Sequence, residues 1–157
     1  MRLPRLLEAM LTGAVLTLAG QVYQIVLNNP LADSFTLGLA SGASLGSGIA
    51  LFLGLSFLWF PIFSIIFSLI TLLLVLSVSA MLAKGYPVQM LILTGLLLGA
   101  LLNALLYLLV LINPKKMNPI ASYLFGGFAS AEYQDVMIIS LIASVAIIVS
   151  VSYTHLT

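Results

Sequence analysis

Few residues in this chain of 157 could perform acid–base, nucleophilic or metal chemistry. It has no cysteine and one histidine, His155, and its four acidic residues are Glu8, Asp33, Glu132 and Asp135. Without cysteine, neither a disulfide framework nor a thiolate metal site can form. A nucleophilic triad, a HExxH zinc site and a pair of axial haem ligands cannot be built from this inventory. We therefore expect no catalytic site, no metal and no cofactor.

The polar side chains within the apolar stretches are amides and hydroxyls, whose chemistry is hydrogen bonding. Thr17, Gln21, Gln24 and Asn28 are spaced by 4, 3 and 4 residues, which on an α-helix keeps them within about 60° of one another. A polar stripe is costly against lipid, so this face must meet protein or water. Two interpretations stay open: helix packing through amide hydrogen bonds, and the wall of a substrate path.

Regularly spaced glycines form a second pattern. Gly38, Gly42 and Gly46 make a GxxxGxxxG sequence, in which each step of four returns to nearly the same helix face. A face of small residues lets a neighbouring backbone approach closely. We expect a closely packed helix here, because an ordinary loop between helices explains the ordered glycines less well.

A short polar break precedes these glycines. Residues 28–30 read Asn-Asn-Pro, and proline disfavours the αR conformation in the residue before it. A helix should therefore end at this point. Asp33 and Ser34 are candidates for the N-cap of the helix that follows.

A further small-and-polar pattern lies in the second half of the chain. Gly95 and Gly99 form another GxxxG pair, and Asn103 follows four residues later. An amide near the middle of an apolar segment needs a hydrogen-bonding partner. Helix packing and a pore wall both fit a helix that is small and polar on one side.

The composition shows which solvent these elements face. Hydrophobic residues make up 62% of the chain, charged residues make up 6%, and the mean hydropathy is +1.27. A soluble domain carries about 25% charged residues to cover its surface, so lipid is the alternative solvent. The net charge of +1 says nothing about nucleic acid, and the sequence has no basic runs, so we expect no nucleic-acid partner.

The apolar stretches predict a polytopic bundle of membrane helices. Strands of a membrane barrel would alternate apolar and polar residues, and these stretches do not, so we predict an all-α fold. Pro61 separates the second span from the third, and the apolar run 120–125 predicts a short helix at the membrane surface or re-entering it. The five expected spans, each near the roughly 20 residues needed, are 6–27, 38–60, 62–83, 88–112 and 136–150.

The two ends and the charges between the spans lead to further expectations. The start does not read as a signal peptide, because the first apolar stretch is too long and lacks a cleavage site. The final VSYTHLT, residues 151–157, resembles a translated adaptor, so we expect a partial transmembrane domain at 1–150 and a non-native tail at 151–157. Five spans place Arg2, Arg5, Lys115 and Lys116 on one side, which the positive-inside rule would make cytoplasmic.

Four strings in combination resemble the FecCD/BtuC-type permeases, the membrane subunits of ABC importers for iron–siderophore, haem and vitamin B12. The strings are RLPRLLEAMLTGAVLTLAG (2–20), NNPLADSFTLGLASGASLGSGIAL (28–51), LILTGLLLGALLNAL (91–105) and YLFGGFASAEYQDV (123–136). The resemblance covers nearly all of residues 2–150. It implies part of a ten-helix permease, matching its second to sixth helices.

The resemblance also implies roles for the polar features. It places Arg2 and Arg5 on the outer side of the membrane, which conflicts with the positive-inside rule. On that side, arginines of the family dock acidic groups of a substrate-binding protein. The alternative is that the two side chains only snorkel at a helix end. It favours packing for the stripe that begins at Thr17 and for the ladder that begins at Gly38. Pathway candidates are Gly95, Gly99 and Asn103. The cytoplasmic gate turn would be Lys84, Gly85, Tyr86, Pro87, Val88 and Gln89.

The function implied is that of a permease subunit moving an iron chelate across a bacterial inner membrane by alternating access. The implied partners are a second permease copy or paralogue, cytoplasmic ATPase subunits, a substrate-binding protein and membrane lipid. The chain has no GxxxxGK[ST] nucleotide motif of its own. The alternatives are a secondary transporter, which usually keeps an ionisable residue in mid-membrane, and a non-transporting membrane scaffold.

Overall fold

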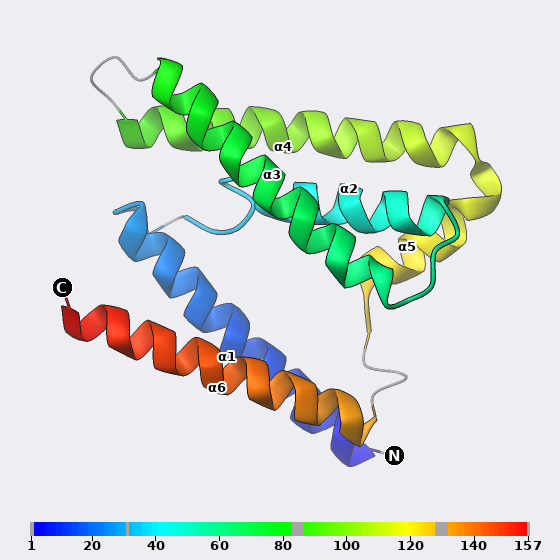
Figure 1. Ribbon diagram of the computed structural model, residues 1–157, viewed down its shortest axis with the longest axis horizontal. Helices are drawn as coiled ribbons and strands as arrows, with labels where there is room; N and C mark the ends of the chain where they lie inside the picture. The colour runs from blue at the N-terminus through cyan, green and yellow to red at the C-terminus, as the bar shows by residue number, and fades with distance from the viewer. Residues whose placement is uncertain (1, 31, 83–86, 128–131, 157) are drawn as a thin grey trace. The chain divides into compact units, whose positions relative to one another are not determined.

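The computed structural model describes residues 2–30, 32–82, 87–127 and 132–156, with side chains as far as residue 148. Every regular element within these ranges is a helix, which confirms the all-α prediction. The chain divides into two compact units (Figure 1). One unit combines Met1–Leu31 with Gly126–Thr157, and the other is Ala32–Phe125.

The first unit consists of two long helices that lie side by side and run in the same direction, α1 (Arg2–Val26) and α6 (Tyr133–Leu156) (Figure 1). Both begin a few residues before the predicted spans. In α1, Pro4 lies in the first turn, where its missing N–H costs no hydrogen bond. In α6, Asp135 accepts a hydrogen bond from the backbone N–H of Glu132 at 3.0 Å and places its charge at the positive end of the helix dipole.

The end of α1 is a Schellman motif, which corrects the sequence-based placement of Asn28. The backbone N–H of Asn28 donates to the carbonyl of Ile25 at 3.1 Å, and that of Asn29 donates to the carbonyl of Gln24 at 3.0 Å. Asn28 has a φ of 46°, the left-handed conformation of the residue just beyond a helix end. Asn28 therefore terminates the helix and is not a member of its polar stripe.

The second unit packs three helices and a short amphipathic helix around a small apolar core. The helix α2 contacts both α3 and α4, which also contact each other. The buried core side chains are Leu45, Leu106 and Ile120, one from each of α2, α4 and α5. The elements of this unit are α2 (Leu39–Phe52), α3 (Trp59–Leu82), α4 (Pro87–Ile112), the 3-10 turn η1 (Pro114–Lys116) and α5 (Met117–Phe125).

The predicted second span is wrong in length. α2 has 14 residues, about 21 Å at 1.5 Å per residue, whereas a spanning helix must cross about 30 Å. The chain leaves the helix at Leu53, and Gly54 reverses it with a φ of 74°. Pro61 consequently lies inside the first turn of α3 and not between the two helices.

Three helices in the described part of the chain are long and apolar enough to cross a membrane, α1, α3 and α4. The two last match the predicted spans 62–83 and 88–112 closely. The apolar stretch counted in α6 is Tyr133–Ile148, because side chains are described only that far. The structure thus supports a multi-pass membrane protein with shorter helices between its spans.

The short helix predicted at 120–125 is α5, and an aromatic contact fixes it to the start of α3. The ring of Tyr123 lies 5.1 Å from that of Phe60 and 6.3 Å from that of Phe57, both edge-to-face. Burial raises the pKa of the Tyr123 phenol, and a hydrogen bond with Ser64 acts in the opposite direction. The turn after α2 and the chain after α4 are therefore held at the same end of this unit.

Candidate functional site

The second and third glycines of the ladder lie against α3. A Cβ at Gly42 would lie 2.9 Å from the Cβ of Thr71, and one at Gly46 would lie 2.8 Å from the Cβ of Phe67. Real Cβ atoms do not approach so closely, so the two helices meet with α2 presenting backbone alone. The Thr71 hydroxyl, buried at this contact, donates to the Phe67 carbonyl at 2.8 Å. At Gly42 and Gly46, no side chain larger than hydrogen fits between the two helices.

The first glycine of the ladder has a different neighbour. Gly38 is the N-cap residue of α2, in the left-handed conformation with a φ of 69°. A Cβ at this position would lie 2.7 Å from the carbonyl oxygen of Gly95 and 3.2 Å from the backbone nitrogen of Gly99, both in α4. The GxxxGxxxG sequence is therefore shared between two contacts, with Gly38 on α4 and the other two on α3.

The small-and-polar side of α4 faces the beginning of α2. A Cβ at Gly95 would collide with the carbonyl of Thr36, and one at Gly99 would lie 3.2 Å from the Cα of Gly38. Four residues further on, the Asn103 amide donates to the Ser41 hydroxyl at 3.1 Å. This partly buried bond joins two helices and gives the mid-segment amide the partner that it needs.

The turn before α2 holds this contact in shape. Asp33 does not cap α2; its Oδ1 accepts hydrogen bonds from the backbone N–H groups of Phe35 at 2.9 Å and Thr36 at 2.8 Å. The Thr36 hydroxyl donates a hydrogen bond to the backbone carbonyl of Asp33 at 2.6 Å. An aspartate that binds backbone groups two and three residues ahead closes a tight turn. The turn sets the position of the Thr36 carbonyl against α4.

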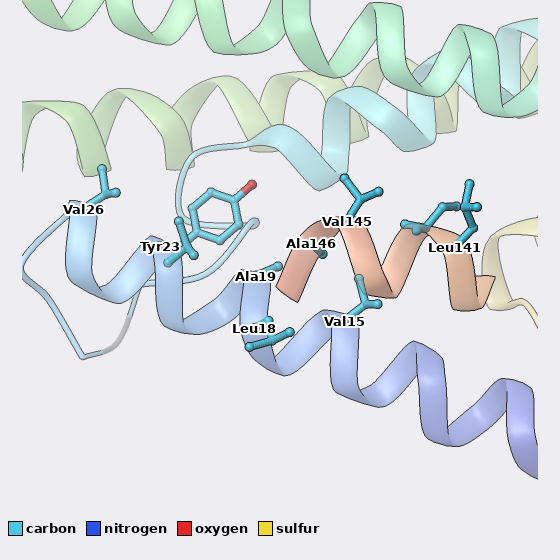
Figure 2. Close-up of a pocket in the computed structure, with 10 residues that line it drawn as sticks. Val15, Leu18, Ala19, Tyr23, Val26, Leu141, Val145 and Ala146 are labelled. Carbon is cyan, nitrogen blue, oxygen red and sulfur yellow. The ribbon is translucent and has the colours of Figure 1, made fainter. Parts of the chain in front are cut away.

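The polar stripe of α1 lies away from α6. The Thr17 hydroxyl donates to the Gly13 carbonyl at 2.8 Å within the helix, and the side chains of Gln21 and Gln24 are exposed. The opposite face of α1, about half a turn around the helix from the polar stripe, forms an apolar groove together with α6 (Figure 2). The groove has a volume of about 710 Å³, and its lining includes Val15, Leu18, Val22, Leu141 and Val145.

The remaining predicted residues lie at helix ends. Arg2 and Arg5 are exposed in the first two turns of α1. Of the predicted gate turn, Lys84, Gly85 and Tyr86 lie outside the described residues, and Pro87, Val88 and Gln89 form the exposed first turn of α4. The structure therefore brings the glycines of α2 against α3 and against the glycines of α4.

Two partners in these contacts escaped the sequence reasoning. Ser41 stands out in the sequence only as one more small residue near the glycines, and nothing there indicates that it accepts a bond from Asn103. Thr71 lies in an apolar stretch that contains other hydroxyl side chains, such as that of Ser68, and its contact with Gly42 depends on how α3 packs. The regular spacing of the glycines indicated a helix contact, but it did not indicate which residues lie opposite the glycines.

Apolar helices packed closely through glycine, with shorter helices between those long enough to span, are the architecture of a multi-pass membrane protein. Comparison with known proteins places the chain more narrowly. It belongs to the FecCD transport family, whose model matches residues 1–156.

Named relatives are permeases of ABC transporters. The chain is 37% identical over 142 residues to the uncharacterized ABC transporter permease protein YvrB of Bacillus subtilis, covering 87% of this chain and 40% of the relative. Two further relatives are the molybdate import system permease protein MolB of Haemophilus influenzae and an iron chelatin transport system permease protein of Helicobacter pylori. The chain is 36% identical to each of them over 138 residues, which covers 87% of this chain and 41% of each relative.

A solved structure shows the same fold. An ABC transporter assigned to the metal-chelate type, in an inward-facing conformation, superposes with a TM-score of 0.76 at 32% sequence identity. The match covers 92% of this chain and 46% of that one. The chain thus spans less than half the length of the relatives it matches.

Proposed function

We propose that this sequence forms part of the permease subunit of a binding-protein-dependent ABC importer in a bacterial inner membrane. Two permease copies or paralogues would enclose the path, and ATP hydrolysis on separate cytoplasmic subunits would drive alternating access. The observation that supports this most is the fold match, since 92% of the chain aligns with a solved ABC transporter at 32% identity.

For the substrate, we propose an iron chelate. A relative named for iron chelatin transport and a solved transporter of the metal-chelate type support this choice. A relative of equal similarity is named for molybdate, so molybdate is the competitor that an experiment must include. A large chelate would need neutral, weakly attractive walls, and the described residues contain no group of three or more His, Cys, Asp or Glu side chains that could hold a metal.

A transport assay tests this proposal. A full-length permease containing this sequence would be reconstituted in liposomes with its ATPase subunits and binding protein, and uptake of a ferric siderophore, haem and molybdate would be measured. We expect ATP-dependent uptake of one of the two iron compounds and none of molybdate. Uptake of molybdate alone would overturn the substrate, and no ATP-dependent uptake of any of them would overturn the importer.

We further propose that Arg2 and Arg5, exposed at the start of α1, dock acidic groups of the binding protein by charge-assisted hydrogen bonds. Reversing both to Glu in the full-length permease should weaken binding-protein affinity by about tenfold or more, because like charges would then face each other. Reversing Lys115 and Lys116 changes the charge equally and is the matched control. Unchanged affinity in the arginine variant would leave snorkelling as their role.

The pathway and gate residues have roles of different kinds in this proposal. Gly95, Gly99 and Asn103 contact the start of α2, so we propose that they act on the path by setting the spacing of two helices and not by touching substrate. The turn 84–89 would lie on the cytoplasmic side, at the inner gate. Its described part, Pro87–Gln89, begins α4, so any movement of that turn would act directly on this helix.

A further inference from the structure

The turn of residues 33–38, which we name the Asp33 turn, supplies the cap that α2 lacks at its N-cap residue. The first N–H groups of a helix have no partner within the helix, and Gly38 makes no side-chain capping bond. The backbone N–H of Leu39 instead donates to the carbonyl of Ser34 at 3.0 Å. Asp33 holds the turn closed, because its carboxylate accepts hydrogen bonds from two backbone N–H groups within it. The beginning of α2 therefore depends on one carboxylate.

The Asp33 turn also lies in backbone contact with α4. A Cβ at Gly95 would meet the carbonyl oxygen of Thr36 and would lie 2.7 Å from the Cα of Leu37, whose side chain is buried. Pro87 begins α4 about two turns before Gly95, roughly 12 Å along the helix axis. Asp33 binds the backbone N–H of Thr36. The carboxylate therefore positions a residue that α4 touches near its beginning.

Sliding of α4 along the Asp33 turn is blocked in both directions. Leu91 lies four positions before Gly95, so a shift by one helical turn would bring its side chain against the Asp33 turn. A shift in the other direction would bring Asn103 to the place of Gly99. Neither side chain fits in a contact where a Cβ alone already collides with backbone atoms. The beginning of α4 and the Asp33 turn must therefore move together.

We propose that the Asp33 turn and the beginnings of α2 and α4 form one rigid body, in which Asp33 is the positioning residue. This inference rests on the proposed importer, in which the first turn of α4, Pro87–Gln89, moves at the cytoplasmic side. That movement reaches α2 through backbone contact and not through flexible side chains. Without the Asp33 carboxylate, the N–H groups of Phe35 and Thr36 lose their acceptor. The turn then changes shape, and part of the movement no longer reaches α2.

A cross-linking experiment tests the rigid contact without any transport. Ser41→Cys with Asn103→Cys places one thiol pair where the native side chains meet at 3.1 Å, in a full-length permease whose other cysteines have been replaced. The permease is assembled with its ATPase subunits, and disulfide formation by iodine is timed in the nucleotide-free and the vanadate-trapped states. We expect equal rates in both states. Rates that differ between the states, or no disulfide in either, would overturn the rigid body.

Substitutions of Asp33 in this cysteine-pair parent test its role. Asp33→Ala should slow disulfide formation by about fivefold or more, because two backbone N–H groups lose their acceptor. Asp33→Asn keeps an acceptor oxygen in the side chain and should restore the rate of the parent. Ser34→Ala is the matched control, since the turn uses the Ser34 carbonyl, and it should have no effect. An alanine variant at Asp33 as fast as the parent, or an asparagine variant as slow as the alanine one, would exclude the positioning role.

Substrate uptake per ATP hydrolysed separates positioning from a general loss of stability. In the full-length importer with Ser41 and Asn103 intact, Asp33→Ala should lower this ratio by about fivefold or more, and Asp33→Asn should restore it. A variant that only unfolds more easily would lose uptake and hydrolysis together, so an unchanged ratio in the alanine variant would contradict the inference. Failure of the unsubstituted importer to take up any substrate would instead overturn the proposed function, while the cross-linking rates still decide whether α2 and α4 form one body.

Discussion

Gly46 and Gly13 are both glycines inside long helices, but their surroundings differ. A Cβ at Gly46 would meet the Phe63 carbonyl and the Phe67 side chain, whereas one at Gly13 would meet no atom within 4 Å. The first glycine is required by a helix contact, and the second has only the backbone freedom that glycine always has. Substitution by alanine at the two sites therefore distinguishes the effect of helix packing on stability from the effect of helix propensity.

Gly46→Ala should lower the free energy of unfolding by about 1–3 kcal/mol, because an added methyl group forces α2 away from α3. Gly13→Ala should leave it unchanged or raise it by up to about 1 kcal/mol through better helix propensity. Both can be measured by denaturation with sodium dodecyl sulfate in mixed micelles. Equal effects of the two substitutions would mean that α2 and α3 do not meet at Gly46.

The bond between Asn103 and Ser41 calls for a double-mutant cycle. Asn103→Leu and Ser41→Ala should each destabilise the protein, and the double variant should lose less than their sum. Interhelical side-chain bonds in membranes give coupling energies of about 0.6 kcal/mol on average, so we expect a coupling of that order. Strictly additive effects would show that the bond at 3.1 Å contributes nothing to stability.

Among the elements, the long apolar helices are the ones that sequence predicts well. The predicted 62–83 and 88–112 lie close to α3 and α4, since an unbroken apolar stretch of that length has few other structures available in lipid. The end of α2 could not be found in this way. Residues on both sides of Gly54 are as apolar as the helix, so hydropathy continues where the backbone turns.

The site was predictable to a similar extent. Spacing alone indicated that the glycines of α2 meet another helix, but dividing them between α3 and α4 requires the tertiary structure. The stripe of α1 was predicted with one member too many. Asn28 continues the spacing in sequence, but its left-handed backbone places it beyond the helix.

The end of α1 yields a prediction at the scale of the element. Asn28→Val should destabilise the protein by about 1–2 kcal/mol, because a β-branched residue is strained in the left-handed conformation. Asn28→Gly should be neutral or slightly stabilising, since glycine is the usual residue at this position of a Schellman motif. Thermal unfolding in detergent compares the two. A valine variant as stable as the glycine variant would exclude the motif.

For the whole molecule, the structure predicts which loops face the same side of the membrane. α3 separates Ser56, in the turn before it, from Gln89, in the first turn of α4. The contact between Gly54 and Lys116 places the end of α4 beside the turn that contains Ser56. The membrane must therefore lie between the residues near 56 and those near 89.

The absence of cysteine from the sequence makes this claim directly measurable. Ser56→Cys, Lys115→Cys and Gln89→Cys, one at a time, would be reacted with a membrane-impermeant maleimide in sealed vesicles of known orientation. The account predicts that Cys substitutions at 56 and 115 react from one side and the substitution at 89 from the other. Reaction of all three from the same side would contradict the membrane-spanning arrangement of α3 and α4, on which the permease proposal depends.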